Sequence, residues 1–320
     1  MVSLDTVQRK KIYLAGHSGM VGRATLTELT VNGYTNILTT PPDFDLRRQD
    51  LVNRYFEIHR PESVIVAAAR VGGILANSRY PYDFIIDNLL IEANLINAAV
   101  KFNVPDLIFL GSSCIYPQKA SQPIKEESLL TGSLEPTNEW YAIAKIGGIK
   151  LCQAANRQFG LNYLSLMPTN LYGEGDNFDL QTSHVLPAML RKFHDAKPDG
   201  SVQLWGTGSP MREFMHVRDL AKAIRFVLEH ECPEDIYNVG TGEDISIRDL
   251  AKMIQMTVGH EGPIVWDSGK PDGTPRKLLD VSRLHSMGWK HTIELEDGIA
   301  ATYKWMINNT KTLREVKHGS

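Results

Sequence analysis

Cysteine is scarce in this sequence, and its three copies lie far apart at Cys114, Cys152 and Cys232. None belongs to a Cys-x-x-Cys pair, and no spacing of cysteine with histidine resembles a zinc site. The sequence therefore predicts neither a disulfide framework nor a metal centre. We expect reduced thiols and a cytoplasmic protein.

An excess of one charge and long apolar runs are also lacking. The formal net charge is −3, so no basic field exists to attract nucleic acid. No apolar run approaches the roughly 18 residues of a membrane span, and residues 1–11 lack the apolar core of a signal peptide. We therefore expect no nucleic-acid partner and no membrane partner. The 320 residues, 42% of them hydrophobic, suffice for one large α/β domain, alone or with a smaller lobe.

A glycine-rich turn follows the first predicted strand. Residues 11–15 form an apolar strand pattern, and a helical pattern covers 21–32, with Gly16, Gly19 and Gly22 between and at its start. Strand, glycine turn and helix are typical of a dinucleotide-binding fold, in which the helix start offers N–H groups to phosphates. The spacing is Gly-x-x-Gly-x-x-Gly rather than Gly-x-Gly-x-x-Gly. We predict nucleotide binding here, and the alternative is a glycine turn without a ligand.

Strand and helix patterns alternate through the first half of the chain. Further strands are predicted at 36–40, 63–69, 106–110 and 163–167, and helices at 83–102 and 141–158. The continuous apolar run at 63–69 is typical of a strand buried on both faces. The alternation predicts an α/β fold with a doubly wound parallel sheet of the Rossmann type, whose ligands bind at the carboxyl ends of the strands.

The alternation changes beyond residue 173, which predicts a second, smaller unit. Elements are expected at 183–197 (helix), 202–205 (strand), 216–230 (strand and helix), 235–239 (strand), and 247–258 and 295–308 (helices). We predict an NADP-binding Rossmann domain over 8–173, with 213–242 returning to it. A C-terminal substrate-binding lobe is predicted over 174–212 and 243–310, followed by a charged tail at 311–320.

A tyrosine and a lysine four residues apart, Tyr141 and Lys145, fall on one face of the predicted helix at 141–158. Side-chain oxygens within 136–139 are expected to cap its start, and Gly160 to end it. An ammonium beside a phenol favours the phenolate, so Lys145 is predicted to lower the pKa of Tyr141 and make it a proton donor and acceptor near neutral pH. Because two common residues often occur at this spacing, the alternative is a surface lysine beside a half-buried tyrosine.

The second predicted strand ends without the acidic residue that would bind the ribose hydroxyls of NAD. Asp43 and Asp45 come only later in the chain. This absence favours NADP(H). Three basic residues could reach a 2′-phosphate: Arg23, Arg47 and Arg48. The alternative is that each is an ordinary surface arginine.

Five separated motifs, taken with the glycine turn, Ser112 and the Tyr141/Lys145 pair, resemble the extended short-chain dehydrogenase/reductase family, and within it the GDP-L-fucose synthases. The motifs are Gly111-Ser-Ser-Cys-Ile-Tyr-Pro117, Pro168-Thr-Asn-Leu-Tyr-Gly173, Ser183-His184, Pro210-Met-Arg-Glu-Phe214 and Lys270-Pro-Asp-Gly-Thr-Pro-Arg-Lys-Leu-Leu-Asp280. The resemblance spans about residues 11–308, nearly the whole chain.

The resemblance implies conversion of GDP-4-keto-6-deoxy-D-mannose to GDP-L-fucose, by 3,5-epimerisation and NADPH-dependent reduction of the C4 ketone. Tyr141 would protonate the C4 oxygen, Ser112 would hydrogen-bond it, and Lys145 would hold the nicotinamide ribose. Cys114 and His184 would be the acid/base pair of the epimerisations. Alternatively, the thiol is a buried small hydrophobe and the imidazole a surface histidine.

Further contacts are implied by the same resemblance. Cofactor contacts are expected from Gly16, His17, Ser18, Gly19, Met20, Val21, Gly22, Asp45, Leu46, Leu110, Gly111, Ser112, Ser113, Lys145, Pro168, Thr169, Asn170, Leu171 and His184. Contacts with the GDP-sugar substrate are expected from Lys192, Trp205, Arg212 and Asp272. Family members often carry arginine where this chain has Ser18 and Pro41, so its preference for NADPH is expected to be weaker.

Three other functions are alternatives to this reaction, and the sequence also predicts how two copies of the chain associate. Related sugar dehydratases carry Asp-Glu where this chain has Ser113 and Cys114, which argues against dehydration. The enzyme alternative is an epimerase/reductase of another GDP-4-keto sugar, such as a 6-deoxy-heptose, and the non-enzyme alternative is a nucleotide-sensing scaffold on a retired reductase fold. The helices at 83–102 and 141–158 are apolar over more than one face, which predicts a homodimer with a four-helix interface.

Overall fold

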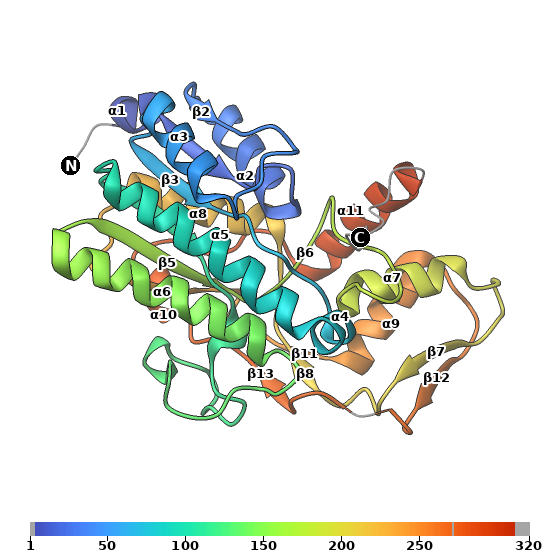
Figure 1. Cartoon of the computed structure of the whole chain (residues 1–320). Coiled ribbons are helices and arrows are strands. Elements are labelled where there is room, and N and C mark those ends of the chain that lie inside the picture. Colours follow the sequence, from blue (N-terminus) through green and yellow to red (C-terminus); the bar gives the residue numbers. More distant parts are fainter. Residues whose placement is uncertain (1–3, 271, 311–320) are drawn as a thin grey trace.

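The computed structural model describes residues 4–270 and 272–310, and a six-stranded parallel sheet forms the centre of this part (Figure 1). The strands are β1 Ile12–Ala15, β2 Ile37–Leu38, β3 Ser63–Val66, β4 Asp106–Leu110, β5 Asn162–Pro168 and β10 Ile236–Val239. Their order is β10-β5-β4-β3-β1-β2, and each neighbouring pair is parallel. The predicted doubly wound α/β fold is thereby confirmed. The predicted tail at 311–320 lies outside the described residues.

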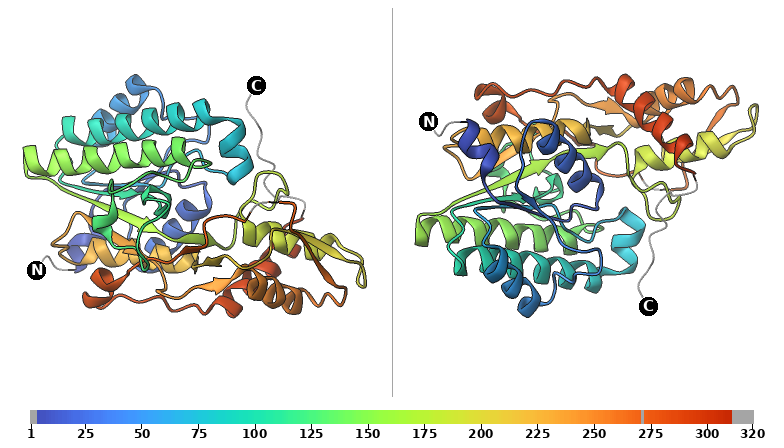
Figure 2. Two further views of the ribbon diagram at one scale, coloured as in Figure 1. Left: turned by 90° about the horizontal axis from the view of Figure 1, so that it is seen from below. Right: turned by 90° about the horizontal axis from the view of Figure 1, so that it is seen from above.

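Helices cover both faces of the sheet (Figure 2). On one face lie α2 Met20–Val31 and α8 Val217–Glu229, which contact each other, with α1 Leu4–Arg9 against α8. On the other lie α3 Gln49–His59, α5 Pro81–Lys101 and α6 Glu139–Phe159, and α5 runs beside α6 along its length. Each face buries its own apolar cluster, since side chains of successive strand residues point to opposite faces.

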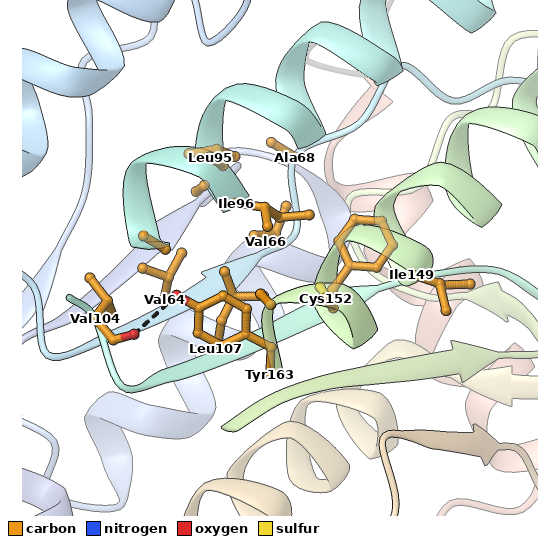
Figure 3. Close-up of a cluster of buried hydrophobic side chains, with 14 of the residues drawn as sticks. Val64, Val66, Ala68, Leu95, Ile96, Val104, Leu107, Ile149, Cys152 and Tyr163 are labelled. Atoms are coloured by element: carbon orange, nitrogen blue, oxygen red, sulfur yellow. Dashed lines mark hydrogen bonds between the residues drawn. The ribbon is translucent and has the colours of Figure 1, made fainter. Parts of the chain in front are cut away.

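The cluster beneath α5 and α6 holds these helices rigidly on the sheet (Figure 3). Val64 and Leu107 of the sheet, Leu95 of α5 and Ile149 of α6 are fully or almost fully buried in it. Tyr163 satisfies its hydroxyl there by donating to the Val104 carbonyl oxygen at 3.0 Å. The outer face of α6 therefore stays fixed relative to the strand ends.

The second unit lies at one end of the sheet (Figures 1 and 2). Its helices are α7 Val185–Asp195, α9 Ile247–Val258 and α11 Leu295–Asn308, and its strands β7 Val202–Trp205 and β12 Ile264–Asp267 are paired in parallel. Short strands join it to the central sheet: β6 Asn170–Tyr172 with β9 Phe214–His216, and β8 Met211–Arg212 between β11 Ile245–Ser246 and β13 Arg276–Lys277. Two short α-helices, α4 Ile74–Arg79 and α10 Ser282–Ser286, and two 3-10 helices, Ser113–Ile115 and Glu126–Ser128, are also present.

Local sequence signals placed the strands of the central sheet and most of the longer helices, but one cap was wrong and several elements were missed. Gly160 adopts φ 66° directly after α6, the left-handed conformation that ends a helix. Asn138 stands at the start of α6, but its side chain makes no capping hydrogen bond, so the expected side-chain cap is wrong. The elements that had not been predicted are the helices α1, α3, α4 and α10 and the strands β6, β8, β11, β12 and β13. Among the described residues, no helix is both long and apolar enough to cross a membrane.

Candidate active site

The glycine turn after β1 has close backbone contacts that only glycine permits. Gly16 has φ +87°, and a Cβ at Gly22 would lie 2.1 Å from the Gly16 carbonyl oxygen. Helix α2 begins directly after Gly19, which provides no side-chain cap, so the first N–H groups of α2 remain for an anion. Arg23 donates from Nε to the Ser18 carbonyl oxygen at 2.8 Å and so lies against this turn. The turn therefore fits the phosphates of a dinucleotide.

The other residues expected at the cofactor come from the same edge of the sheet. His17, Met20 and Val21 belong to the glycine turn and the first turn of α2. Leu110 ends β4, Gly111 follows it, and residues 168–171 lead from β5 into β6. Because the carboxyl ends of parallel strands meet at one edge, the fold brings these segments together.

Two of the three arginines considered for a 2′-phosphate are paired with carboxylates. Arg47 donates to Asp45 and to Asp87, each at 2.9 Å, and Asp45 is thereby held in the loop after β2. Arg48 bonds Asp50 at 2.7 Å. Leu46, also predicted at the cofactor, accepts a hydrogen bond from α5 through its carbonyl oxygen. Arg23 is therefore the one of these arginines that lies at the glycine turn.

The turn after β4 places a hydroxyl and a thiol together. Ser112 Oγ accepts a hydrogen bond from the Cys114 backbone N–H at 3.3 Å and caps a short 3-10 helix, Ser113–Ile115. Burial raises the pKa of the Cys114 thiol, while the Lys277 ammonium and the Ser112 hydroxyl oppose that rise. Both side chains are only partly exposed.

Tyr141 and Lys145 lie on one face of α6, but their electrostatic relationship differs from the prediction. Lys145 Nζ forms a buried ion pair with Glu92 Oε1 at 2.9 Å and donates to the Leu110 carbonyl oxygen at 2.9 Å. Its distance from the Tyr141 ring centroid is 5.7 Å. Burial raises the pKa of Tyr141, and the negative charges of Cys114 and Glu92 raise it further. The expected lowering by Lys145 is wrong for this state, because Glu92 balances the ammonium charge.

His184 stands directly before α7, at the start of the first helix of the lobe. The loop before it is braced by Asp179, which accepts hydrogen bonds from the Thr182 backbone and hydroxyl at 2.9 and 2.8 Å. Gly73, in the loop after β3, donates its N–H to the Thr182 carbonyl oxygen at 2.9 Å. His184 is exposed at the surface, yet the many protein atoms around it and the charge of Lys277 lower the pKa of His184. The sequence had not indicated that Gly73 would contact the segment before His184.

Lys277 is a second residue that sequence reasoning missed. It lies on β13 opposite Arg212 of β8, and burial lowers the pKa of both side chains. Its charge acts on Cys114 and on His184, so it lies near both groups expected to move protons. The motif that contains Lys277 was recognised, but only the strand pairing shows that this lysine faces inward.

Of the residues expected to contact substrate, Lys192 and Trp205 lie together on the lobe, while Arg212 lies on β8. Trp205 is 50% exposed, with Lys192 Nζ 5.8 Å and Lys270 Nζ 5.5 Å from its ring centroid. Such a cationic aromatic surface suits a nucleotide base and its phosphates. The Asp272 carboxylate is already hydrogen-bonded within the protein. Its oxygens accept hydrogen bonds from the Thr207 N–H at 2.9 Å and from the Thr207 hydroxyl at 2.7 Å. It therefore braces the turn after β7.

The chain belongs to the NAD dependent epimerase/dehydratase family, whose model matches residues 12–240. Within this class, it is 53% identical to GDP-L-fucose synthase 1 of Arabidopsis thaliana, over 96% of each chain. A solved GDP-L-fucose synthetase from Naegleria fowleri bound to NADP is similar with a TM-score of 0.89 and 28% identity, over 96% of both chains. A GDP-6-OMe-4-keto-L-xylo-heptose reductase from Campylobacter jejuni is similar with a TM-score of 0.88 and 36% identity, over 94% of this chain and 99% of the other.

Proposed function

We propose that this protein converts GDP-4-keto-6-deoxy-D-mannose to GDP-L-fucose, as an NADP(H)-dependent epimerase and reductase. The observation that carries the proposal is the full-length similarity to GDP-L-fucose synthase at 53% identity. Its site supports both halves of the reaction, because Ser112, Tyr141 and Lys145 stand with Cys114 and His184 at the same strand ends. The reductases of heptose sugars resemble it less closely in sequence.

The proposed reduction uses the groups on β4 and α6. When bound, NADPH supplies a hydride to C4 of the sugar. Tyr141 gives its proton to the C4 oxygen, and Ser112 donates a hydrogen bond to the same oxygen. The raised pKa of Tyr141 suits this direction, because the phenol carries its proton throughout the neutral range. Lys145 binds the nicotinamide ribose.

The proposed epimerisations use the thiol and the imidazole. A C4 ketone acidifies the hydrogens on C3 and C5, and Tyr141 with Ser112 stabilises the enolate that forms. Cys114 reaches the sugar from the β4 turn, and His184 reaches it from the start of α7. One removes a proton and the other returns one to the opposite face. Lys277 favours the thiolate of Cys114 and so supports its action as a base.

The test is incubation with GDP-4-keto-6-deoxy-D-mannose and NADPH in deuterated water, with analysis of the product by NMR. The proposal predicts GDP-L-fucose that carries deuterium at C3 and C5. A C4-reduced sugar without deuterium would leave only the reductase. Faster turnover of a GDP-4-keto-6-deoxy-heptose, measured as kcat/KM, would instead support the heptose alternative.

We further propose a homodimer built from α5 and α6. Leu90 on α5 is 39% exposed, and Ile143 and Leu151 on α6 are 37% and 43% exposed. These apolar side chains lie on the face of the helix pair away from the sheet, where a second copy would cover them in a four-helix interface.

We also propose a cytoplasmic location, which the three free cysteines support.

A further inference from the structure

A buried carboxylate outside the expected active-site set contacts the catalytic lysine. Glu92, on α5, is 1% exposed, and its Oε1 lies 2.9 Å from Lys145 Nζ, whose side chain is 2% exposed. The same ammonium donates to the Leu110 carbonyl oxygen at 2.9 Å and lies 4.7 Å from the centre of the Phe109 ring. A carboxylate, a carbonyl and an aromatic face thus fix Lys145 at the carboxyl end of β4.

The neighbouring helix leaves room for this carboxylate. Gly148 of α6 faces α5, and a Cβ at this position would lie 2.9 Å from Glu92 Oε2 and 2.4 Å from Phe109 Cζ. Any larger residue at 148 would displace the carboxylate or the ring. The pair is therefore part of the packing between α5, α6 and β4, and its geometry depends on a glycine that helices otherwise disfavour.

Stability alone does not account for a buried ion pair. Removing two charges from water costs more than their attraction often returns, and apolar replacements of similar volume are frequently as stable or more so. The surrounding residues of α5 and α6 are mostly apolar, so such a replacement was available at this position. A charged pair retained here is explained by what it does to the reacting groups beside it.

We propose that Glu92 is a positioning residue for the C4 reduction, which acts by holding the Lys145 ammonium at the end of β4, beside the proton donor Tyr141. The inference rests on the proposed reductase activity. The ammonium is held by its ion pair with Glu92 and by the hydrogen bond that it donates to the Leu110 carbonyl oxygen, and we expect a remaining N–H group to bind the nicotinamide ribose. Without the carboxylate, Lys145 would lose the contact that determines its orientation.

The carboxylate also affects the ionisation of Tyr141. The titratable and charged groups that face Tyr141 are Cys114 on the β4 turn, Glu92 on α5 and Lys145 on its own helix. After burial and Cys114, the negative charge of Glu92 raises the pKa of Tyr141. A proton donor works only below its pKa, so reduction is lost as the pH rises through that value. Removing the Glu92 charge lowers the pKa, and the loss then begins at lower pH.

The test compares Glu92→Gln, which keeps the size and removes the charge, with wild-type protein. For Glu92→Gln we expect kcat for reduction at pH 7 to fall about tenfold or more, since a 1 Å misplacement can cost ~10²-fold. We also expect the alkaline limb of its pH profile to move to lower pH, and NADP(H) to bind more weakly in isothermal titration calorimetry. Glu92→Asp, which restores the charge, should return the alkaline limb towards wild type.

Asp219→Asn is the matched control, because Asp219 is a fully buried carboxylate that pairs with Lys222 at 3.0 Å on the other face of the sheet. It should lower Tm without moving the pH profile or the NADP(H) affinity. If Glu92→Gln behaves in the same way, the pair is only structural and the inference is wrong. If wild-type protein reduces no ketone, the proposed function fails instead, and NADP(H) affinity still tests whether Glu92 positions Lys145.

Discussion

Gly73 lies against Ser183 so closely that a Cβ on the glycine would stand 2.5 Å from the Ser183 carbonyl oxygen. The Gly73 N–H also donates to the Thr182 carbonyl oxygen at 2.9 Å. This contact joins the loop after β3 to the segment that delivers His184. The position of the proposed imidazole acid/base therefore depends on a glycine in the nucleotide-binding part of the chain.

The first prediction is that Gly73→Ala displaces His184. The added methyl group must push the Ser183 backbone away, and His184 is the next residue. We expect deuterium exchange at C3 and C5 to fall by roughly tenfold to a hundredfold, because misplaced catalytic groups lose rate steeply. NMR of the sugar measures it. Gly200→Ala is the control, since its Cβ would approach Lys197 only to 3.3 Å. Equal exchange in both variants would show that this contact does not position His184.

The second prediction concerns Lys277→Met, which removes a charge that acts on both Cys114 and His184. Burial already raises the pKa of Cys114, and Lys277 is the largest influence that opposes the rise. Without it, the thiolate forms only at still higher pH. Exchange at carbon should therefore slow at pH 7 and recover at higher pH, while reduction changes little. Lys290→Met, at an exposed position, serves as control. An unchanged pH dependence of exchange would contradict the role given to Lys277.

The chain's local signals predicted those parts of the site that lie within one segment. The glycine turn, the Ser112/Cys114 turn and the Tyr141/Lys145 pair are each set by one element and its nearest neighbours. The ion pair of Glu92 with Lys145 was not predicted, because it depends on how α5 packs against α6. Its only signal was that Glu92 is the one acidic residue in the second half of α5, after Asp83 and Asp87 near the start of that helix.

One missed helix had a signal that was available in the sequence. Val52, Tyr55 and Phe56 of α3 are buried, and their spacing of three and four residues is that of one helix face. The many charged residues around them made the segment resemble a loop. Gly73 offered no comparable signal, because nothing local shows that a loop after β3 meets the segment before α7.

The third prediction is that Leu151→Arg separates the proposed dimer. The side chain is 43% exposed on α6, and an arginine there would place a like charge against its copy across a two-fold interface. Light scattering at micromolar concentration should give twice 35.8 kDa for wild type and 35.8 kDa for the variant. Arg157→Leu, in the last turn of the same helix, removes a charge instead and should leave the dimer intact. A monomeric wild type would refute the interface.

The fourth prediction is that Ser18→Arg strengthens the preference for NADPH. Ser18 is exposed in the glycine turn, where the resemblance implies arginine in other family members. Arginine bonds phosphate with two N–H groups, and a hydrogen bond to a charged group contributes roughly 1.5–3 kcal/mol. The ratio of kcat/KM for NADPH over NADH should rise by about tenfold or more. Ser18→Gln, similar in length but uncharged, should leave the ratio near wild type. A ratio unaffected by the arginine would place the 2′-phosphate elsewhere.

The last prediction separates epimerisation from reduction through Cys114→Ser. The hydroxyl is close in size to the thiol but far too weak a base near neutral pH, whereas reduction requires Tyr141, Ser112 and Lys145 and no thiol. Deuterium should therefore cease to enter at C3 and C5, while slow reduction of the unepimerised ketone persists. Cys152→Ser, which changes a buried thiol of α6 itself, controls for the general loss of a cysteine. Wild-type exchange in Cys114→Ser would mean that the thiol only packs, and His184 with Lys277 would then be the groups to test as the base.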